Sequence, residues 1–337
     1  MMDDKTSAGI RPMTFREAVE GWAEEREKLR YVQAYTARRS RQKALLFEPW
    51  IGGKAVDEVA PADILLALSE LGTSGGRLKE GLSSATLRAA HLAASQACEW
   101  AVGQGRAQGN PFTKVKRPKA NYRQSRCLTQ REATELATKV ARNAEAYMML
   151  DDVRHASFCL AVCIALATGL RRGEVFALKW DDVDGDRLRV GVSKAVKADG
   201  SVGNPKSIAG VRSVAIGKKL MKLLGKAEEW HSEILPADRP AGCARLIVCD
   251  ETGGRASMNA FEHWWRSWAD RNGFVGLRFH ELRHTHATLL ISNGVDVKTV
   301  QMRLGHSSAV VTMSCYAHAI PLSDGAAAET LDAALFD

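Results

Sequence analysis

A basic segment without any acidic residue divides this chain into two parts. Residues 103–126 contain three glycines, two prolines and seven Lys or Arg residues. Glycine and proline interrupt helices and strands, so this composition is typical of a connecting segment. The chain of 337 residues is also long for a single domain. We therefore expect two domains, at residues 12–105 and 127–320, joined by a basic linker at residues 106–126.

Positive charge is concentrated in the N-terminal part of the chain. Residues 1–126 carry 21 Lys and Arg against 14 Asp and Glu, whereas residues 127–337 carry 26 against 25. This excess favours a polyanionic partner such as nucleic acid, although a solvated basic surface or a disordered hinge would have the same composition. The candidate nucleic-acid contacts belong to one basic helical run and to the linker: Arg38, Arg39, Arg41, Lys43, Lys114, Lys116, Arg117 and Lys119.

The first domain carries helix signals along its length. Thr14 and Glu17 have the spacing of a capping box, in which each side chain bonds the backbone of the other residue. Apolar residues then recur at helical spacing, and a second helix is expected over residues 35–50. A third helix opens at Pro61, because proline fits the first helical turn, and a fourth covers residues 84–102. We expect these four helices to form a compact domain.

The second domain combines helices with a small sheet. A helix is expected to begin at Thr129, and a long apolar helix covers residues 153–168 and ends at Gly169. Alternating apolar residues predict strands over residues 186–192 and 213–216, with a turn-rich hairpin between them. The predicted fold class is therefore mainly α with a small antiparallel β-sheet: a helical N-terminal domain followed by a mixed α/β domain.

The chain lacks the sequence signals of export and of membrane insertion. No stretch reaches the roughly 18 apolar residues that a membrane span needs, and the N-terminus has no apolar signal region. The seven cysteines form no C-x-x-C pair, which suits a reducing compartment. We expect a cytoplasmic protein without membrane contact, with a flexible tail at residues 1–11.

The segment HELRH, at residues 280–284, has two incompatible interpretations. H-E-x-x-H is the pattern of a zinc protease, with two histidines one helical turn apart and a glutamate base. The alternative is H-x-x-R, a histidine and an arginine directed at a phosphate. In the zinc interpretation His306 or His318 could supply a third ligand, but Arg283 would lie beside a dication. We keep a zinc metalloprotease as a remote alternative.

Three further motifs carry reactive side chains. TGLRRGE (168–174) presents arginines after a helix, and a guanidinium can bind two phosphate oxygens at once. The alternative is that these arginines only stabilise the C-terminal end of the helix through its dipole. PKSIAGVRSV (205–214) places a lysine in a hairpin, where it is either a proton donor or simply solvated. LGHSS (304–308) is followed by Tyr316, whose hydroxyl has an ordinary pKa near ~10. Neighbouring arginines would stabilise the phenolate form of that tyrosine.

These five elements together resemble the tyrosine recombinases, also called phage integrases. TGLRRGE, PKSIAGVRSV, HELRH, LGHSS and the following tyrosine occur in the order of that family, and the resemblance covers roughly residues 14–320. It implies a helical core-binding domain, a tyrosine-recombinase catalytic domain, and site-specific recombination of DNA through a 3′-phosphotyrosine intermediate. No metal, nucleotide or other cofactor is implied.

The resemblance also implies a role for each motif residue. Arg171 and Arg283 would clamp the scissile phosphate, and His306 would hydrogen-bond one of its non-bridging oxygens. Tyr316 would attack the phosphorus. Losing either arginine is expected to be crippling, since one arginine contributes roughly 10³–10⁵ in rate to phosphoryl transfer.

Three other residues complete the implied site. Lys206 would protonate the leaving 5′ oxygen, although Lys194 and Lys197 lie in the same hairpin region. His280 would act as a base toward the tyrosine or orient it. Glu174 is expected to brace the fold near Arg171 and not to touch DNA.

The family resemblance implies partners as well as chemistry. Double-stranded DNA would be bound by a homotetramer, and DNA-bending or directionality proteins are candidate accessory partners. The tail at residues 321–337 could form a short apolar helix that docks on a neighbouring subunit or packs on its own domain. A type IB topoisomerase-like relaxing enzyme is the main alternative function. A DNA-binding protein with a degenerate catalytic domain is disfavoured, because every catalytic group is present.

Overall fold

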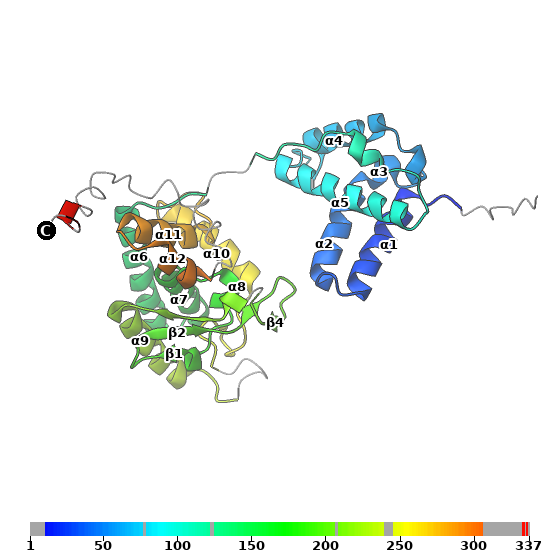
Figure 1. The fold of residues 1–337 in the computed structure, drawn as a ribbon. Helices are drawn as coiled ribbons and strands as arrows, with labels where there is room; N and C mark the ends of the chain where they lie inside the picture. Colours follow the sequence, from blue (N-terminus) through cyan, green and yellow to red (C-terminus); the bar gives the residue numbers. More distant parts are fainter. Residues whose placement is uncertain are drawn as a thin grey trace, which may run out of the picture. The chain divides into compact units, whose positions relative to one another are not determined.

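The chain folds into two compact units, residues 1–124 and 125–337, each with its own hydrophobic core (Figure 1). The boundary between the units lies inside the predicted basic segment. In the described part of the chain, every helix is too short or too polar to cross a lipid bilayer. This computed structural model describes residues 11–76, 79–121, 125–205, 208–238 and 245–305, together with residues 332, 333 and 335.

The described residues of the first unit form helices joined by loops, and none of them forms a named strand. The predicted capping box is present, because Thr14 Oγ1 accepts from the Glu17 amide (3.3 Å) and the Glu17 carboxylate accepts from the Thr14 amide (2.9 Å). The apolar faces of the helices meet in one core. The α-helices are α1 (Phe15–Lys28), α2 (Ala34–Ala44), α3 (Glu48–Ile51), α4 (Pro61–Ser74) and α5 (Ser84–Gly103).

The single helix predicted over residues 35–50 is wrong. The segment contains α2, a 3₁₀ turn η1 (Leu45–Phe47), and then α3. Pro49 explains the interruption, because in a continuous helix its ring would clash with the carbonyl of Leu45, whereas proline is tolerated in the first turn of a new helix. The break turns Phe47 into the core, where it is fully buried.

At residue 106, where the predicted linker begins, the chain still contacts the first unit: the Arg106 amide donates to the Ala101 carbonyl (3.0 Å). Residues between 106 and 121 also contact the first unit, and a 3₁₀ helix η3 (Pro111–Lys114) buries Phe112. The Phe112 ring lies 5.1 Å from the ring of Phe47, measured between centroids, in an edge-to-face arrangement. This aromatic burial draws the chain onto the core despite its basic composition.

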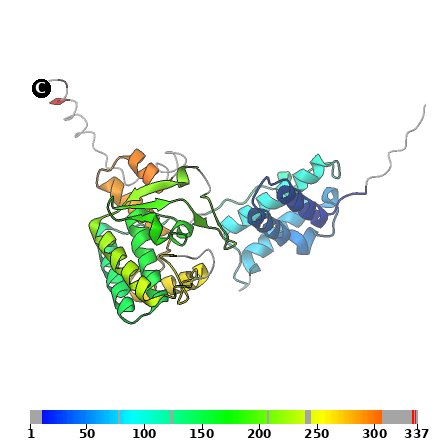
Figure 2. The ribbon, with the colours of Figure 1, turned by 90° about the horizontal axis from the view of Figure 1, so that it is seen from below.

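The second unit surrounds one buried helix. Helix α7 (Val153–Thr168) is apolar on nearly all sides and is buried, as expected for a helix without a polar face. Helices α6 and α11 pack along it, and Figure 2 shows the same unit from the perpendicular direction. The remaining helices of the described residues are α6 (Gln130–Met149), α8 (Arg172–Val175), α9 (Lys218–Ile234), α10 (Met258–Arg271), α11 (Glu281–Ser292) and α12 (Val297–Leu304).

A three-stranded antiparallel sheet lies beside α12. Its order is β1 (Val183–Asp184), β2 (Arg189–Val192) and β5 (Arg212–Ala215), with Val190 opposite Val214. Strand β1 is additional to the two predicted strands. The strand predicted from residue 186 begins only at residue 189, because the Asp184 carboxylate accepts from the Arg187 amide (2.8 Å) and closes a turn.

A second hairpin connects β2 to β5. Its strands are β3 (Ala195–Val196) and β4 (Val202–Gly203). The two sheets together are small beside the helices. The predicted fold class, mainly α with a small antiparallel sheet, is confirmed.

Candidate functional site

Helix α7 ends at a glycine, Gly169, whose position has no room for a side chain. Gly169 has a φ of +69°, in the left-handed region, and its amide bonds the Ala165 carbonyl. A Cβ atom at this position would lie 2.7 Å from Cδ2 of His286 and 2.7 Å from Cδ2 of Leu304. The glycine therefore lets α11 and α12 approach the C-terminal end of α7.

Arg283 occupies the space that this close approach creates. Its Nη1 donates to the Gly169 carbonyl (2.7 Å), and its Nη2 donates to the Leu304 carbonyl (2.6 Å). These carbonyls end α7 and α12, where helix dipoles concentrate negative charge. The guanidinium is thus held by two helix ends, and the residue is buried.

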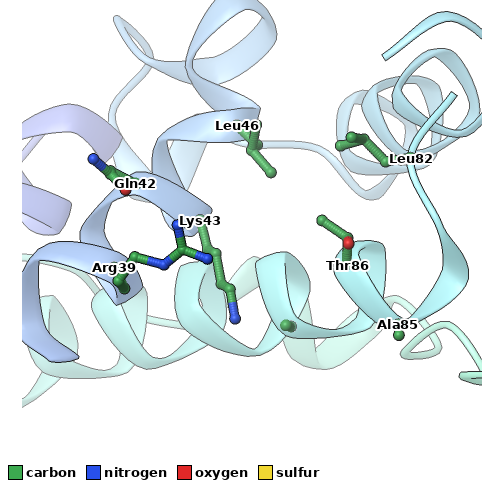
Figure 3. A pocket seen from close by; sticks show the side chains of 8 residues that line it. Arg39, Gln42, Lys43, Leu46, Leu82, Ala85 and Thr86 are labelled. Carbon is green, nitrogen blue, oxygen red and sulfur yellow. The ribbon is translucent and has the colours of Figure 1, made fainter. Parts of the chain in front are cut away.

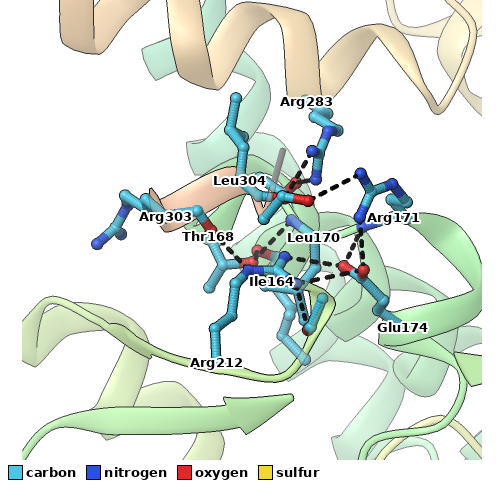
Figure 4. Close-up of polar contacts among 12 residues, drawn as sticks. Ile164, Thr168, Leu170, Arg171, Glu174, Arg212, Arg283, Arg303 and Leu304 are labelled. Atoms are coloured by element: carbon cyan, nitrogen blue, oxygen red, sulfur yellow. Dashed lines mark hydrogen bonds and ion pairs between the residues drawn. The ribbon is translucent and has the colours of Figure 1, made fainter. Parts of the chain in front are cut away.

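Arg171 follows the same turn and lies at the start of α8. Its Nη2 donates to the Gly305 carbonyl (3.3 Å), next in sequence to the carbonyl that holds Arg283. Its side chain remains 41% exposed, so it can contact a ligand. Figure 4 shows Arg171 and Arg283 directed toward the same end of α12, marked by Leu304.

Glu174 is buried beneath Arg171. Its Oε1 accepts from Arg171 Nη1 (2.9 Å) and its Oε2 accepts from the Arg171 amide (2.9 Å). Arg212 Nη2 also donates to Oε2 (2.9 Å). Burial alone would raise the pKa of the Glu174 carboxyl, but the hydrogen bond and charge of Arg212, together with Arg171, lower it below the ordinary value. Glu174 therefore carries its charge in the buried site.

Arg212 is the member of this cluster that sequence reasoning missed. It lies on β5, and its side chain is only 7% exposed. The sequence signal for Arg212 is its place in the motif of residues 205–214, where it has no obvious chemistry of its own. Only the fold brings this arginine to Glu174.

His280 lies at the start of α11 and close to the arginines. Its ring packs edge-to-face on the ring of His284, with 5.3 Å between the centroids. Desolvation by the surrounding protein, followed by the charges of His284 and Arg283, lowers the pKa of His280 to about 4. Arg171 adds to the same effect. The residue is nevertheless exposed, so a neutral imidazole is available at the surface.

Glu281 is engaged in a way that does not suit a zinc protease. Its carboxylate accepts from Nε (3.0 Å), Nη2 (2.6 Å) and the amide (2.7 Å) of Arg278, and also from the Arg126 amide (3.0 Å). It is almost completely buried. A protease base must instead face a metal-bound water. Among the described residues, no group of three His, Cys, Asp or Glu side chains is placed to hold a metal ion.

Three predicted site residues, Lys206, His306 and Tyr316, lie outside the described residues. The alternative lysines are described. Lys194 Nζ donates to the Asn204 side chain (3.2 Å), and Lys197 lies against Gly203 in the β3–β4 hairpin. The C-terminal tail of residues 321–337 is likewise almost entirely outside the described part.

The candidate nucleic-acid contacts of α2 differ in their surroundings. Arg39 and Lys43 line a hollow of about 460 Å³ between α2 and α5, together with Leu46 and Thr86 (Figure 3). Arg41 instead forms an ion pair with Glu20 of α1. The other basic candidates, Arg38, Lys114, Lys116, Arg117 and Lys119, are exposed.

The chain is similar in sequence to integrases and tyrosine recombinases. The model of the phage integrase family matches residues 126–321. The ICEBs1 integrase of Bacillus subtilis (strain 168) is 33% identical over 174 residues, which are 50% of this chain and 47% of that protein. Tyrosine recombinase XerC of Corynebacterium efficiens is 30% identical over 244 residues, which are 72% of this chain and 70% of the relative. This chain thus spans about half the length of the first relative.

Solved structures show the same fold. The Tn1549 transposon integrase in complex with a circular intermediate DNA superposes with a TM-score of 0.73 at 20% identity, covering 94% of this chain and 98% of that one. A lambda integrase tetramer bound to a Holliday junction gives a TM-score of 0.65 at 16% identity, covering 92% and 84%. At these identities the likeness establishes the architecture.

Proposed function

Because this chain belongs to the phage integrase family, we propose that it recombines DNA at specific sites through a covalent 3′-phosphotyrosine intermediate. The family resemblance predicted from the five motifs is confirmed by the family match. The match covers the part of the chain that contains all five motifs, from residue 168 to residue 316.

One observation carries the proposal: two arginines from distant parts of the chain are held by neighbouring carbonyls. Arg171 bonds the carbonyl of Gly305, and Arg283 bonds that of Leu304. Two positive groups anchored at one point can neutralise the non-bridging oxygens of a phosphodiester. Because their positions are set before DNA binds, they need no rearrangement when charge develops in the transition state.

The remaining roles follow the chemistry of transesterification. Tyr316 Oη forms a new bond to phosphorus, and the bond from phosphorus to the 5′ oxygen breaks. Neutral His280 accepts the tyrosine proton, and Lys206 gives a proton to the departing 5′ oxygen. His306 donates to a non-bridging oxygen. One phosphodiester replaces another, so rejoining by the reverse steps needs no ATP.

The relatives support DNA as the substrate. The Tn1549 integrase structures contain a circular intermediate DNA or transposon right end DNA, and a lambda integrase tetramer is bound to a Holliday junction. We propose that this chain also binds duplex DNA and recombines it as a tetramer in the cytoplasm. The helical first unit would serve as the core-binding domain, with its basic residues on DNA. Docking of the C-terminal tail on a neighbouring subunit remains part of this proposal.

Replacement of the nucleophile tests the proposal. A nicked duplex that loses a short fragment on cleavage traps the covalent adduct, which is detected by its shift on a denaturing gel. Tyr316→Phe should bind this DNA and form no adduct, whereas Tyr31→Phe, at an exposed tyrosine of the first unit, should form it normally. An adduct with Tyr316→Phe would place the nucleophile elsewhere.

A further inference from the structure

We propose that Arg212 is a positioning residue that sets the orientation of Arg171 through Glu174. This inference rests on the proposed recombinase function. Arg212 is not itself a candidate for DNA contact, because its side chain is only 7% exposed. It acts through Glu174 on Arg171, the residue that we propose to contact the phosphate.

The first part of the evidence is the shared carboxylate. Arg212 donates to both oxygens of Glu174, through Nη2 to Oε2 (2.9 Å) and through Nη1 to Oε1 (3.3 Å). Arg171 uses the same two oxygens through its side chain and its amide. Glu174 thus lies between the two arginines, and Arg212 determines how its carboxylate is turned toward Arg171. The dashed contacts in Figure 4 follow this chain of three side chains.

The second part of the evidence is that Arg212 also donates hydrogen bonds to the backbone of two other segments. Its Nε donates to the Arg303 carbonyl (2.7 Å) and its Nη1 donates to the Gly210 carbonyl (2.9 Å). In the sequence, Arg303 precedes His306 by three residues, and Gly210 follows Lys206 by four. One buried guanidinium therefore joins the Arg171 motif to the segments that lead to two other proposed catalytic residues.

The third part of the evidence is that the Arg212 guanidinium occupies the space where Gly305 has no side chain. At Gly305 a Cβ atom would lie 3.0 Å from Arg212 Nη1 and 2.7 Å from the Ala209 carbonyl. The same glycine supplies the carbonyl that accepts from Arg171. Gly305 thus leaves room for the Arg212 guanidinium at the end of α12, where its own carbonyl binds Arg171.

The same sheet offers a matched control. Arg189 of β2 bonds Ser213 on the neighbouring strand, through Nε to its hydroxyl (2.8 Å) and Nη2 to its carbonyl (2.8 Å). Its hydrogen bonds to Ser213 involve neither Arg171, Glu174 nor α12. Loss of Arg189 removes two side-chain hydrogen bonds of the same sheet and leaves the contacts of Arg212, Glu174 and Arg171 in place.

The test measures single-turnover adduct formation on the nicked duplex, DNA affinity and thermal unfolding for four variants. These are R212Q, E174Q, the double variant R212Q/E174Q, and the control R189Q. R212Q should slow adduct formation by about 10- to 100-fold, the size of effect that a small misplacement of a catalytic group produces. Its DNA affinity should change little, and R189Q should cleave like the unmodified chain.

The double variant separates positioning from plain stabilisation. R212Q leaves the buried Glu174 carboxylate with one fewer partner, which lowers the unfolding temperature. R212Q/E174Q removes that buried charge and should regain unfolding temperature while adduct formation stays slow. Recovery of both properties would make Arg212 a stabilising residue only, and an R212Q rate equal to that of the unmodified chain would also overturn the inference. Absence of adduct from the unmodified chain would instead refute the recombinase proposal.

Discussion

Arg212 Nη2 lies 2.9 Å from Oε2 of Glu174, and both side chains are almost fully buried. The pair joins strand β5 to the short helix α8, two segments that are 38 residues apart in the sequence. A buried ion pair of this kind holds its geometry only while both partners keep their charge. The consequences for the neighbouring Arg171 can be measured.

The first prediction concerns acid stability. The pKa of Glu174 is lowered in the folded chain from an ordinary value of 4.5, so its ionised form stabilises the fold at neutral pH. This contribution is complete above pH 4.5 and is lost as the pH falls below that value and through the folded pKa. Urea unfolding of the unmodified chain should therefore weaken more steeply below pH 4.5 than that of Glu174→Gln. Parallel curves would show that the buried pair does not titrate as expected.

The second prediction concerns the protonation of His280. With a pKa of about 4, its imidazole is neutral at pH 7 and gains a proton only as the pH approaches 4. The unfolded chain takes up that proton near the ordinary value of 6.5, so this residue favours folding less as the pH drops from 6.5 toward 4. NMR titration of histidine-labelled protein without DNA should show no inflection near 6.5 for the signal that His280→Gln removes. A midpoint at or above 6.5 would contradict the prediction.

The third prediction concerns the glycine at the end of α12. Gly305 has a φ of +66°, and a side chain there would also press on the Ala209 carbonyl. Gly305→Ala should lower the free energy of unfolding by at least about 1–2 kcal/mol, the cost of a left-handed backbone for an L-residue, and should slow adduct formation. Gly225→Ala is the control, because that glycine lies inside α9 with open space around it. It should gain about 0.5–1 kcal/mol instead, and equal effects at both positions would refute the account.

The fourth prediction separates the basic residues of α2. Arg39 and Lys43 line the hollow beside α5, whereas Arg41 is paired with Glu20. If the first two contact phosphates, Arg39→Ala and Lys43→Ala should weaken DNA binding, and each should reduce the slope of log K against log salt concentration by about 1. Arg41→Ala should change this slope less. Fluorescence anisotropy across a salt series measures the slope for all three variants. An equal reduction of the slope in all three would show that Arg41 contacts DNA despite its ion pair with Glu20.

Local sequence signals predicted local structure well. The capping box at Thr14, the helix start at Thr129 and the end of α7 at Gly169 were all predicted, because each depends on residues within one helical turn. The helix over residues 35–50 was predicted wrongly, since apolar periodicity continues across Pro49 although the backbone hydrogen bonds cannot. The burial of Phe112 was not predicted, because the basic residues around it indicated a linker.

The sequence by itself determined the family, the main-α fold class and the order of the motif residues, because these depend on residue types and spacing along the chain. Only the tertiary structure decided what Glu281 and Arg212 do. In the sequence Glu281 resembles a protease base, but in the fold it binds Arg278 and the Arg126 amide, which belongs to a segment far away in the chain. The part that we propose for Arg212 exists only because the fold brings its side chain to Glu174 of α8. Both roles depend on hydrogen bonds that form when distant segments are packed together and water is excluded, which no local pattern encodes.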